Sequence, residues 1–199
     1  MASILVVCTG NICRSPMAEG FLRALLASRG VTGIEVRSAG TSGWGGSAAV
    51  PESVEAAAEL GADIAAHLAR RVDREMLEEA DLIVAMCAEH RDAVAALAPS
   101  ACPRTFTLKE LVRLLEELPP PGSAPDPIEI LRERVEAAGA LRRSGFTGDP
   151  LDEDVSDPLG LPLASYRVVA SELDGWSARL VDGLWGAARP APPVRSAEA

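Results

Sequence analysis

The stretch VVCTGNICRSP, residues 6–16, places a cysteine and an arginine, Cys8 and Arg14, in one short loop. Backbone N–H groups from Thr9 onward can converge on one point there, and the start of the following helix adds partial positive charge. Arg14 carries a planar fork that matches two oxygens of a phosphate group. We expect Cys8, at the base of this cationic cup, to be a thiolate, which is a nucleophile for phosphoryl transfer.

Two other interpretations of this loop are weaker. A lone cysteine after a strand is most often a small buried residue, and the Gly-Lys-Ser/Thr of a nucleotide-binding loop is missing. The surroundings favour chemistry, because an apolar run precedes Cys8 and Ser15-Pro16 is a typical helix start. Gly10 and Asn11 are the loop residues that tolerate the positive φ expected here.

The elements that must position this loop follow an alternating pattern. Apolar β-branched runs alternate with helical patterns, which predicts an α/β fold with a parallel sheet and crossover helices. The expected strands are residues 4–7, 34–38, 82–86 and 105–108. The first expected helix begins at Ser15-Pro16. Further helices are expected over residues 54–60, 89–97, 109–118 and 163–184.

Two stretches interrupt this pattern. The proline-rich segment PPPGSAPDP, residues 119–127, cannot be helix interior or central strand. It leads into an amphipathic, charged stretch, residues 128–143, where we expect an extra surface helix. The sequence therefore predicts one domain over residues 1–185, with an insertion at about 119–150 and a disordered tail over 186–199.

Composition excludes several classes of partner. The 199 residues carry a formal charge of −10, whereas nucleic acids and anionic membranes attract basic proteins. No apolar run approaches the roughly 20 residues of a membrane span, and the N-terminus lacks the basic segment of a signal peptide. The four cysteines lack zinc-like spacing. We expect a cytoplasmic protein that needs no metal and no other cofactor and binds neither nucleic acid nor membrane.

The sequence CTGNICRSPMAEGFLR, residues 8–23, resembles the signature of the low-molecular-weight protein-tyrosine phosphatases. The resemblance continues in residues 37–44, 61–72, 80–94 and 156–160, and covers most of the chain from 3 to 185. It implies a three-layer Rossmann-like fold whose four-stranded parallel sheet is flanked by helices. It also implies hydrolysis of phosphotyrosine in proteins, a tyrosine kinase among them, through a cysteinyl-phosphate, with inorganic phosphate as product.

The same resemblance implies a general acid and base in an Asp-Pro pair, Asp157-Pro158, which would protonate the departing oxygen. The other Asp-Pro pairs, Asp126-Pro127 and Asp149-Pro150, lie inside the insertion. It implies that the phosphate-binding residues are Thr9, Gly10, Asn11, Ile12, Cys13 and Arg14. Residues that hold the loop would be Asn11, Ser15, Ser38 and His67. Ile12 and Trp44 would form the wall of the substrate cleft. His90 is expected to be a solvated helix residue.

Three alternatives remain open. One branch of the family acts on phosphoarginine and has threonine where this chain has Ile12. Arsenate reductases share the loop and need two further redox cysteines, for which Cys87 and Cys102 are the candidates. A third alternative is a phosphate-binding interaction module without turnover. The resemblance further implies a disulfide between Cys8 and Cys13 under peroxide, and it leaves the physiological substrate, the kinase, the oligomeric state and the role of the insertion open.

Overall fold

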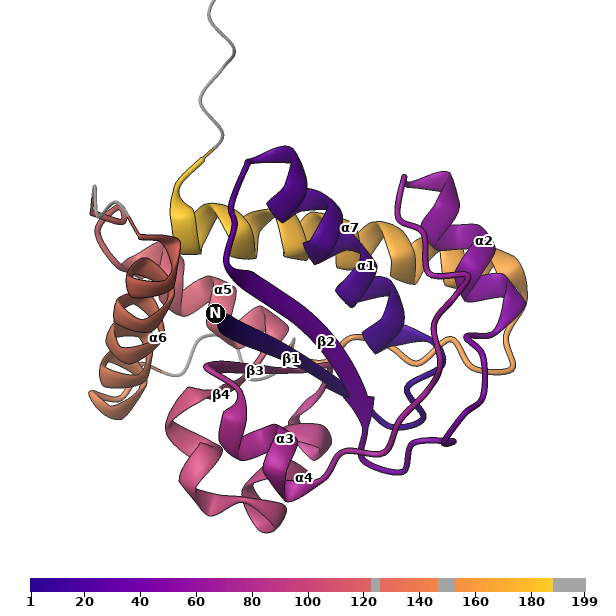
Figure 1. Ribbon diagram of the computed structural model, residues 1–199, viewed down its shortest axis with the longest axis horizontal. Coiled ribbons are helices and arrows are strands. Elements are labelled where there is room, and N and C mark those ends of the chain that lie inside the picture. Colours follow the sequence, from indigo (N-terminus) through magenta and orange to yellow (C-terminus); the bar gives the residue numbers. More distant parts are fainter. Residues whose placement is uncertain (123–125, 147–152, 188–199) are drawn as a thin grey trace, which may run out of the picture.

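The computed structural model describes residues 1–122, 126–146 and 153–187 of the chain (Figure 1). The elements alternate between strands and helices for most of its length. In chain order they are β1 Ala2–Cys8, α1 Arg14–Ser28, β2 Ile34–Gly40, α2 Pro51–Glu59, α3 Arg74–Glu79, β3 Leu82–Ala85, α4 Ala88–Leu97, the 3₁₀ helix η1 Pro99–Arg104, β4 Thr105–Thr107, α5 Leu108–Glu117, α6 Pro127–Arg143 and α7 Leu163–Trp185.

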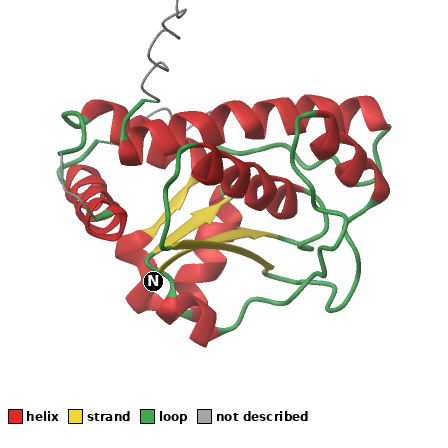
Figure 2. Ribbon diagram, turned by 45° about the horizontal axis from the view of Figure 1, so that its top comes forward, coloured by secondary structure: helices red, strands yellow, loops and turns green. Residues whose placement is uncertain are grey.

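The four strands form one parallel sheet in the order β2-β1-β3-β4, with helices on both faces (Figure 2). The predicted three-layer α/β fold is confirmed. β1 lies in the interior of the sheet, and its last residue, Cys8, is paired in register with Gly40 at the end of β2. The carboxyl ends of parallel strands meet at one edge of the sheet, where ligands of such folds bind. The loop after Cys8 therefore begins at this edge.

Alternate residues of β1 face two separate apolar cores. Ile4 and Val6 belong to the larger core, which is formed with α1, α5 and α7. Leu5 and Val7 belong to the smaller core, which is formed with α3 and α4. A strand buried on both faces reads as a continuous apolar run, which is why β1 was predictable from the sequence.

Two short helices were not predicted. α3 has only six residues, of which Leu77 alone is buried, so it has almost no helical period. The 3₁₀ helix η1 contains Pro99 and Pro103, which the sequence pattern assigns to a loop.

The segment predicted to be an insertion contains α6, which lies at the end of the sheet beside α5 (Figure 1). Asp126 caps its first turn through the N–H of Ile128. The predicted amphipathic helix is present, and its apolar side buries Leu131 and Ala138. Its Arg134 donates to three main-chain carbonyl oxygens, those of Leu115, Pro119 and Gly183. The rest of the predicted insertion at residues 147–150, and the predicted disordered tail from residue 188, lie outside the described residues.

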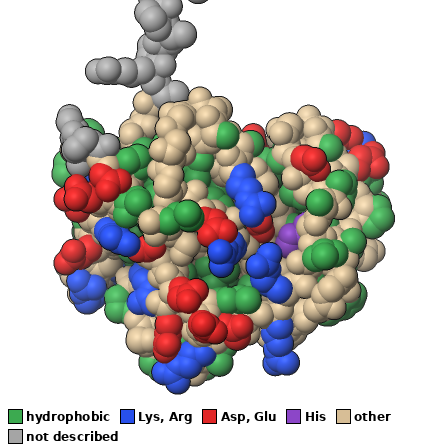
Figure 3. Space-filling view, viewed as in Figure 1, with side chains coloured by type: hydrophobic (Ala, Val, Ile, Leu, Met, Phe, Trp, Pro, Cys, Tyr) green, Lys and Arg blue, Asp and Glu red, His purple; other side chains and the backbone are tan. Residues whose placement is uncertain are grey.

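No helix in the described part of the chain combines the length and the apolar character that crossing a membrane requires. Acidic and basic side chains are intermixed on the face seen in Figure 3.

Candidate active site

The loop from Cys8 to Arg14 turns at one residue, Asn11. Asn11 has φ 57° and is the only non-glycine residue with positive φ in the described part of the chain. Gly10, the other loop residue that tolerates a positive φ, does not adopt one. Gly10 is instead placed where an added Cβ would press on Ile12 at 3.3 Å.

The Asn11 side chain fixes this left-handed turn with three hydrogen bonds. Its Nδ2 donates to Ser15 Oγ at 2.9 Å and to Ser38 Oγ at 2.8 Å. Its Oδ1 accepts from the backbone N–H of Arg70 at 2.9 Å. Asn11 is fully buried, so these bonds satisfy a side chain that water cannot reach.

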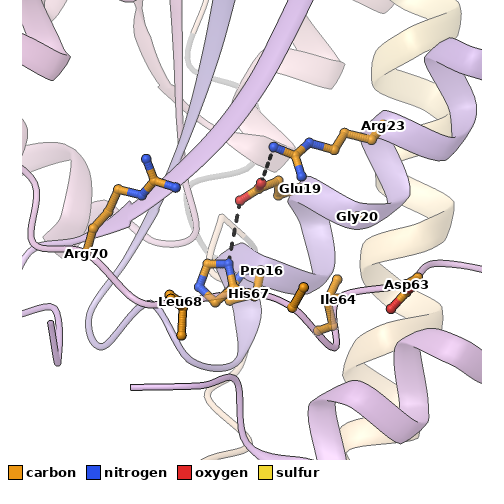
Figure 4. Close-up of a pocket in the computed structure, with 10 residues that line it drawn as sticks. Pro16, Glu19, Gly20, Arg23, Asp63, Ile64, His67, Leu68 and Arg70 are labelled. Atoms are coloured by element: carbon orange, nitrogen blue, oxygen red, sulfur yellow. Dashed lines mark ion pairs between the residues drawn. The ribbon is translucent and has the colours of Figure 1, made fainter. Parts of the chain in front are cut away.

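A second layer of polar residues supports Asn11 through Ser38 and His67. Its members Glu19, Arg23 and His67 are drawn in Figure 4. Ser38 Oγ donates to Glu19 Oε2 at 2.5 Å, and Glu19 also pairs with Arg23 at 2.7 Å. Nε2 of His67 lies 2.8 Å from the Asn11 carbonyl oxygen, which only accepts, so Nε2 carries the proton. Glu19 was missed in the sequence, where its place in the first turns of the predicted helix, in PMAEG, was the available signal.

A cavity of about 340 Å³ opens beside this second layer, between α1 and residues 63–70 (Figure 4). Glu19, Arg23, His67 and Arg70 line it, whereas Cys8, Arg14 and Asp157 do not. It is therefore separate from the loop face on which a phosphate group would bind.

Cys8 receives two hydrogen-bond donors from its own loop. The backbone N–H of Asn11 lies 3.3 Å from the sulfur, and Ser15 Oγ lies 2.9 Å from it. Because Ser15 already accepts from Asn11 Nδ2, its own hydrogen is available to Cys8. Donors of this kind stabilise a thiolate in a buried position.

Arg14 and Asp157, which are 143 positions apart in the chain, are in direct contact. Arg14 Nη2 donates to Asp157 Oδ2 at 2.5 Å, and Nη1 donates to the Val155 carbonyl at 3.1 Å. Nε of Arg14 is buried and has no hydrogen-bond partner among the described residues. Arg14 therefore keeps a donor that an oxygen of a phosphate group can use.

The segment that carries Asp157 is held two and three residues earlier, at Val155 and Asp154, by residues that follow β3 and by α5. Asp154 Oδ1 accepts from the N–H of Ala88, the first residue of α4, at 2.9 Å. The N–H of Val155 donates to the Met86 carbonyl at 2.8 Å. The ammonium group of Lys109 donates to the Asp154 carbonyl at 3.0 Å. Cys87 occupies the N-cap position of α4, but its side chain accepts no hydrogen bond from the first turn. Asp154, from another part of the chain, supplies the acceptor for a first-turn N–H instead.

The two residues expected to form the substrate wall differ in exposure. Trp44 is 56% exposed, and its backbone N–H donates to the Gly10 carbonyl at 3.2 Å, which places it beside the loop. Ile12 is only 3% exposed and belongs to the larger core. Ile12 therefore does not form an open wall opposite Trp44, because its apolar side chain gains more by burial.

The environments of His90 and of the cysteines other than Cys8 follow from burial rather than from their neighbours in the sequence. Burial raises the pKa of the Cys13 thiol to about 11, and the charge of Asp157 acts in the same direction. Burial also raises the pKa of Cys87, whose sulfur lies 3.1 Å from Nδ1 of His90. The expectation that His90 is solvated was wrong, since it is 2% exposed. Cys102, the other reductase candidate, is a free cysteine in η1.

Comparisons with known proteins agree with one another. Residues 3–139 match the family described as low molecular weight phosphotyrosine protein phosphatase. A protein-arginine-phosphatase of Geobacillus stearothermophilus is 33% identical over 181 residues, covering 91% of this chain and 95% of the relative. The low molecular weight protein-tyrosine-phosphatase Etp of Escherichia coli strain K12 is 40% identical over 119 residues, 60% of this chain and 76% of the relative. The crystal structure of a low molecular weight protein tyrosine phosphatase from T. tengcongensis has a TM-score of 0.69 at 33% identity, covering 92% of this chain and 100% of that one.

Proposed function

Because the chain belongs to the low molecular weight phosphotyrosine protein phosphatase family, we propose that it hydrolyses phosphotyrosine in proteins with Cys8 as the nucleophile. The observation that carries this proposal is the pair of contact groups, five residues in all, at and beyond the carboxyl end of β1. There Ser15 and the Asn11 N–H face the Cys8 sulfur, while Arg14 contacts Asp157. A nucleophile, a phosphate clamp and an acid at one site are the requirements of phosphoryl transfer.

The proposed reaction has two steps. In the first, the Cys8 thiolate attacks phosphorus and forms a sulfur–phosphorus bond while the bond to the tyrosine oxygen breaks. Asp157 gives its proton to that oxygen, and Arg14 with the loop N–H groups holds the other phosphate oxygens. In the second, Asp157 takes a proton from water, which attacks phosphorus and releases Cys8 and inorganic phosphate.

The experiment that tests this chemistry measures 4-nitrophenyl phosphate hydrolysis in EDTA by the wild type and by Cys8→Ser. The variant should lose turnover but keep phosphate binding, because Arg14 and the loop N–H groups remain. Turnover by Cys8→Ser at the wild-type rate would refute Cys8 as nucleophile. Inorganic phosphate binding, measured by calorimetry, serves as the control for an intact loop.

Phosphoarginine is the second candidate substrate, because the arginine phosphatase of G. stearothermophilus matches 91% of this chain. Trp44 supports phosphotyrosine instead, whereas Ile12 is buried in the larger core and does not face either substrate. The exposed ring of Trp44 could pack on the phenyl ring of phosphotyrosine.

The ratio of kcat/KM for a phosphotyrosine peptide and the matching phosphoarginine peptide decides between these substrates. The wild type should favour phosphotyrosine, and Trp44→Ala should reduce that preference because it removes the exposed ring. A wild type that favours phosphoarginine would overturn the substrate assignment but leave the cysteine chemistry intact. The proposed setting is the cytoplasm, with phosphotyrosine proteins, a tyrosine kinase among them, as partners.

A further inference from the structure

His90 makes two hydrogen-bond contacts from inside α4, and one of them reaches the phosphate-binding loop. Its Nε2 lies 2.8 Å from the hydroxyl oxygen of Thr9, the residue next to Cys8. Its Nδ1 lies 3.1 Å from the Cys87 sulfur, which fixes the plane of the ring. The imidazole is 2% exposed, so water cannot substitute for these partners.

The Thr9 hydroxyl in turn contacts the phosphate clamp. Arg14 Nη2 donates to Thr9 Oγ1 at 3.5 Å and to Asp157 Oδ2 at 2.5 Å. The same nitrogen therefore serves a neutral hydroxyl and a carboxylate. In either ring tautomer of His90, Thr9 Oγ1 keeps a lone pair for Arg14, because a hydroxyl can donate one hydrogen and accept two.

The two partners of Arg14 Nη2 have different fates in the proposed reaction. As the general acid, Asp157 must be protonated and must turn toward the leaving oxygen, and a neutral carboxyl no longer attracts the guanidinium as an anion does. Thr9 stays, since it belongs to the loop itself. The contact of Arg14 Nη2 with Thr9 Oγ1 is long, at 3.5 Å. Such contacts in a free enzyme often shorten once the substrate is bound.

We propose that His90 is a positioning residue, which holds the Thr9 hydroxyl and thereby keeps Arg14 in place when Asp157 leaves it. The proposal rests on the proposed function, since it assigns Arg14 to the phosphate group. Cys87 is part of the device, because its contact with Nδ1 keeps Nε2 directed at Thr9.

Four variants separate this role from simple packing. His90→Asn can keep the contact of Nδ1 with Cys87 but is too short to reach Thr9, whereas His90→Gln can place a polar atom near the position of Nε2. Thr9→Val removes the hydroxyl and keeps the shape, and the fourth variant combines Thr9→Val with His90→Asn. Inorganic phosphate affinity is measured by calorimetry and kcat/KM with 4-nitrophenyl phosphate, and the melting temperature records stability separately.

We expect phosphate affinity and kcat/KM to fall about 3- to 10-fold in His90→Asn and in Thr9→Val, as for loss of one partly buried hydrogen bond. His90→Gln should recover most of both. The double variant should be no worse than the poorer single variant, because both changes break one connection. Losses that add in the double variant, or unchanged phosphate affinity in both single variants, would overturn the proposal.

A spectroscopic test needs no substitution at His90. The chain has two histidines, so the imidazole ¹⁵N resonances of His67 and His90 can be assigned readily. Thr9→Val should move the His90 resonance and leave that of His67 in place, and an unmoved His90 resonance would overturn the proposal even if His90→Asn failed to fold. If the wild type binds phosphate and the substitutions at His90 and Thr9 do not change phosphate affinity, only the role of His90 is refuted. If the wild type shows neither phosphate binding nor turnover, the proposed function is refuted and this inference with it.

Discussion

Arg14 and Asp157 form an ion pair in which one side chain is buried and the other is half exposed. The pair is 2.5 Å long, and the side-chain exposures are 6% for Arg14 and 44% for Asp157. The buried member is held on its other side by the Val155 carbonyl. The exposed member is thus the one that can swing toward a leaving group without uncovering the core.

Asp157→Ala should slow the hydrolysis of alkyl and phenyl phosphates by about 10²- to 10⁴-fold, because the departing oxygen then leaves without a proton. The loss should shrink for leaving groups of low pKa, such as 4-nitrophenolate. The measurement is kcat for a series of aryl phosphates of graded leaving-group pKa.

Asp126→Asn is the matched control for Asp157, because Asp126 also precedes a proline but caps α6. It should leave the whole series unchanged. A loss in Asp157→Ala that is equal for all leaving groups would show that Asp157 is not the acid.

Asp154→Ala should lower kcat with poor leaving groups by up to about 10²-fold, because it loosens the segment that positions Asp157. It should also cost about 0.5 to 2 kcal/mol of unfolding free energy, as loss of a helix cap does. Asp154→Asn keeps the acceptor oxygen and should behave like the wild type. If both variants kept wild-type kcat and stability, the anchoring role would be refuted.

Stability should fall in acid because of His90. Burial, followed by the charge of Arg14, lowers its pKa to about 4, against the opposing charges of Asp157 and Asp154. In the unfolded chain the histidine pKa is about 6.5, so between about pH 4 and 6.5 the unfolded chain binds a proton that the folded chain does not bind. The free energy of unfolding therefore rises with pH from about 4 to 6.5 and does not change with this group above about pH 6.5. The contribution is on the order of 3 kcal/mol.

Urea unfolding at a series of pH values measures this slope in the wild type and in His90→Gln, which cannot titrate. The difference in unfolding free energy between the two proteins should change between pH 4 and 6.5. Parallel curves over that interval would contradict a neutral, buried His90.

Cys13 should protect Cys8 from peroxide, but slowly at neutral pH. Peroxide oxidises the Cys8 thiolate to a sulfenic acid, and Cys13 sulfur can displace water from it to form a disulfide. The pKa of about 11 leaves little Cys13 thiolate at pH 7. The activity that dithiothreitol restores should therefore increase from pH 7 to pH 9 in the wild type but not in Cys13→Ser, and equal recovery in both proteins would exclude the disulfide.

The sheet and the loop were predictable because local pattern determines them. β1 is a continuous apolar run, and the sequence from Cys8 to Pro16 marks a strand, a turn and a helix start. The contacts that complete the site are not local. Asp154 caps a helix that begins 66 positions earlier in the chain. Glu19 accepts a hydrogen bond from Ser38, which lies 19 positions later.

The error at His90 has the same origin. Within α4, His90 lies in the charged stretch AEHRD, and such a stretch predicts an exposed side chain. In the fold, His90 is buried and contacts Thr9, which lies 81 positions earlier in the chain. Side chains that bridge two elements distant in sequence carry no periodic signal in either element.

The most direct test of the account is the identity of the phosphorylated residue during turnover. The wild type and Asp157→Asn are mixed with 4-nitrophenyl phosphate in EDTA, quenched in acid within one turnover, digested and analysed by mass spectrometry. One phosphoryl group on the peptide that contains Cys8, retained in Cys13→Ser and lost together with turnover in Cys8→Ser, is the predicted result. A phosphoryl group on a peptide without Cys8, or continued turnover by Cys8→Ser, would contradict it.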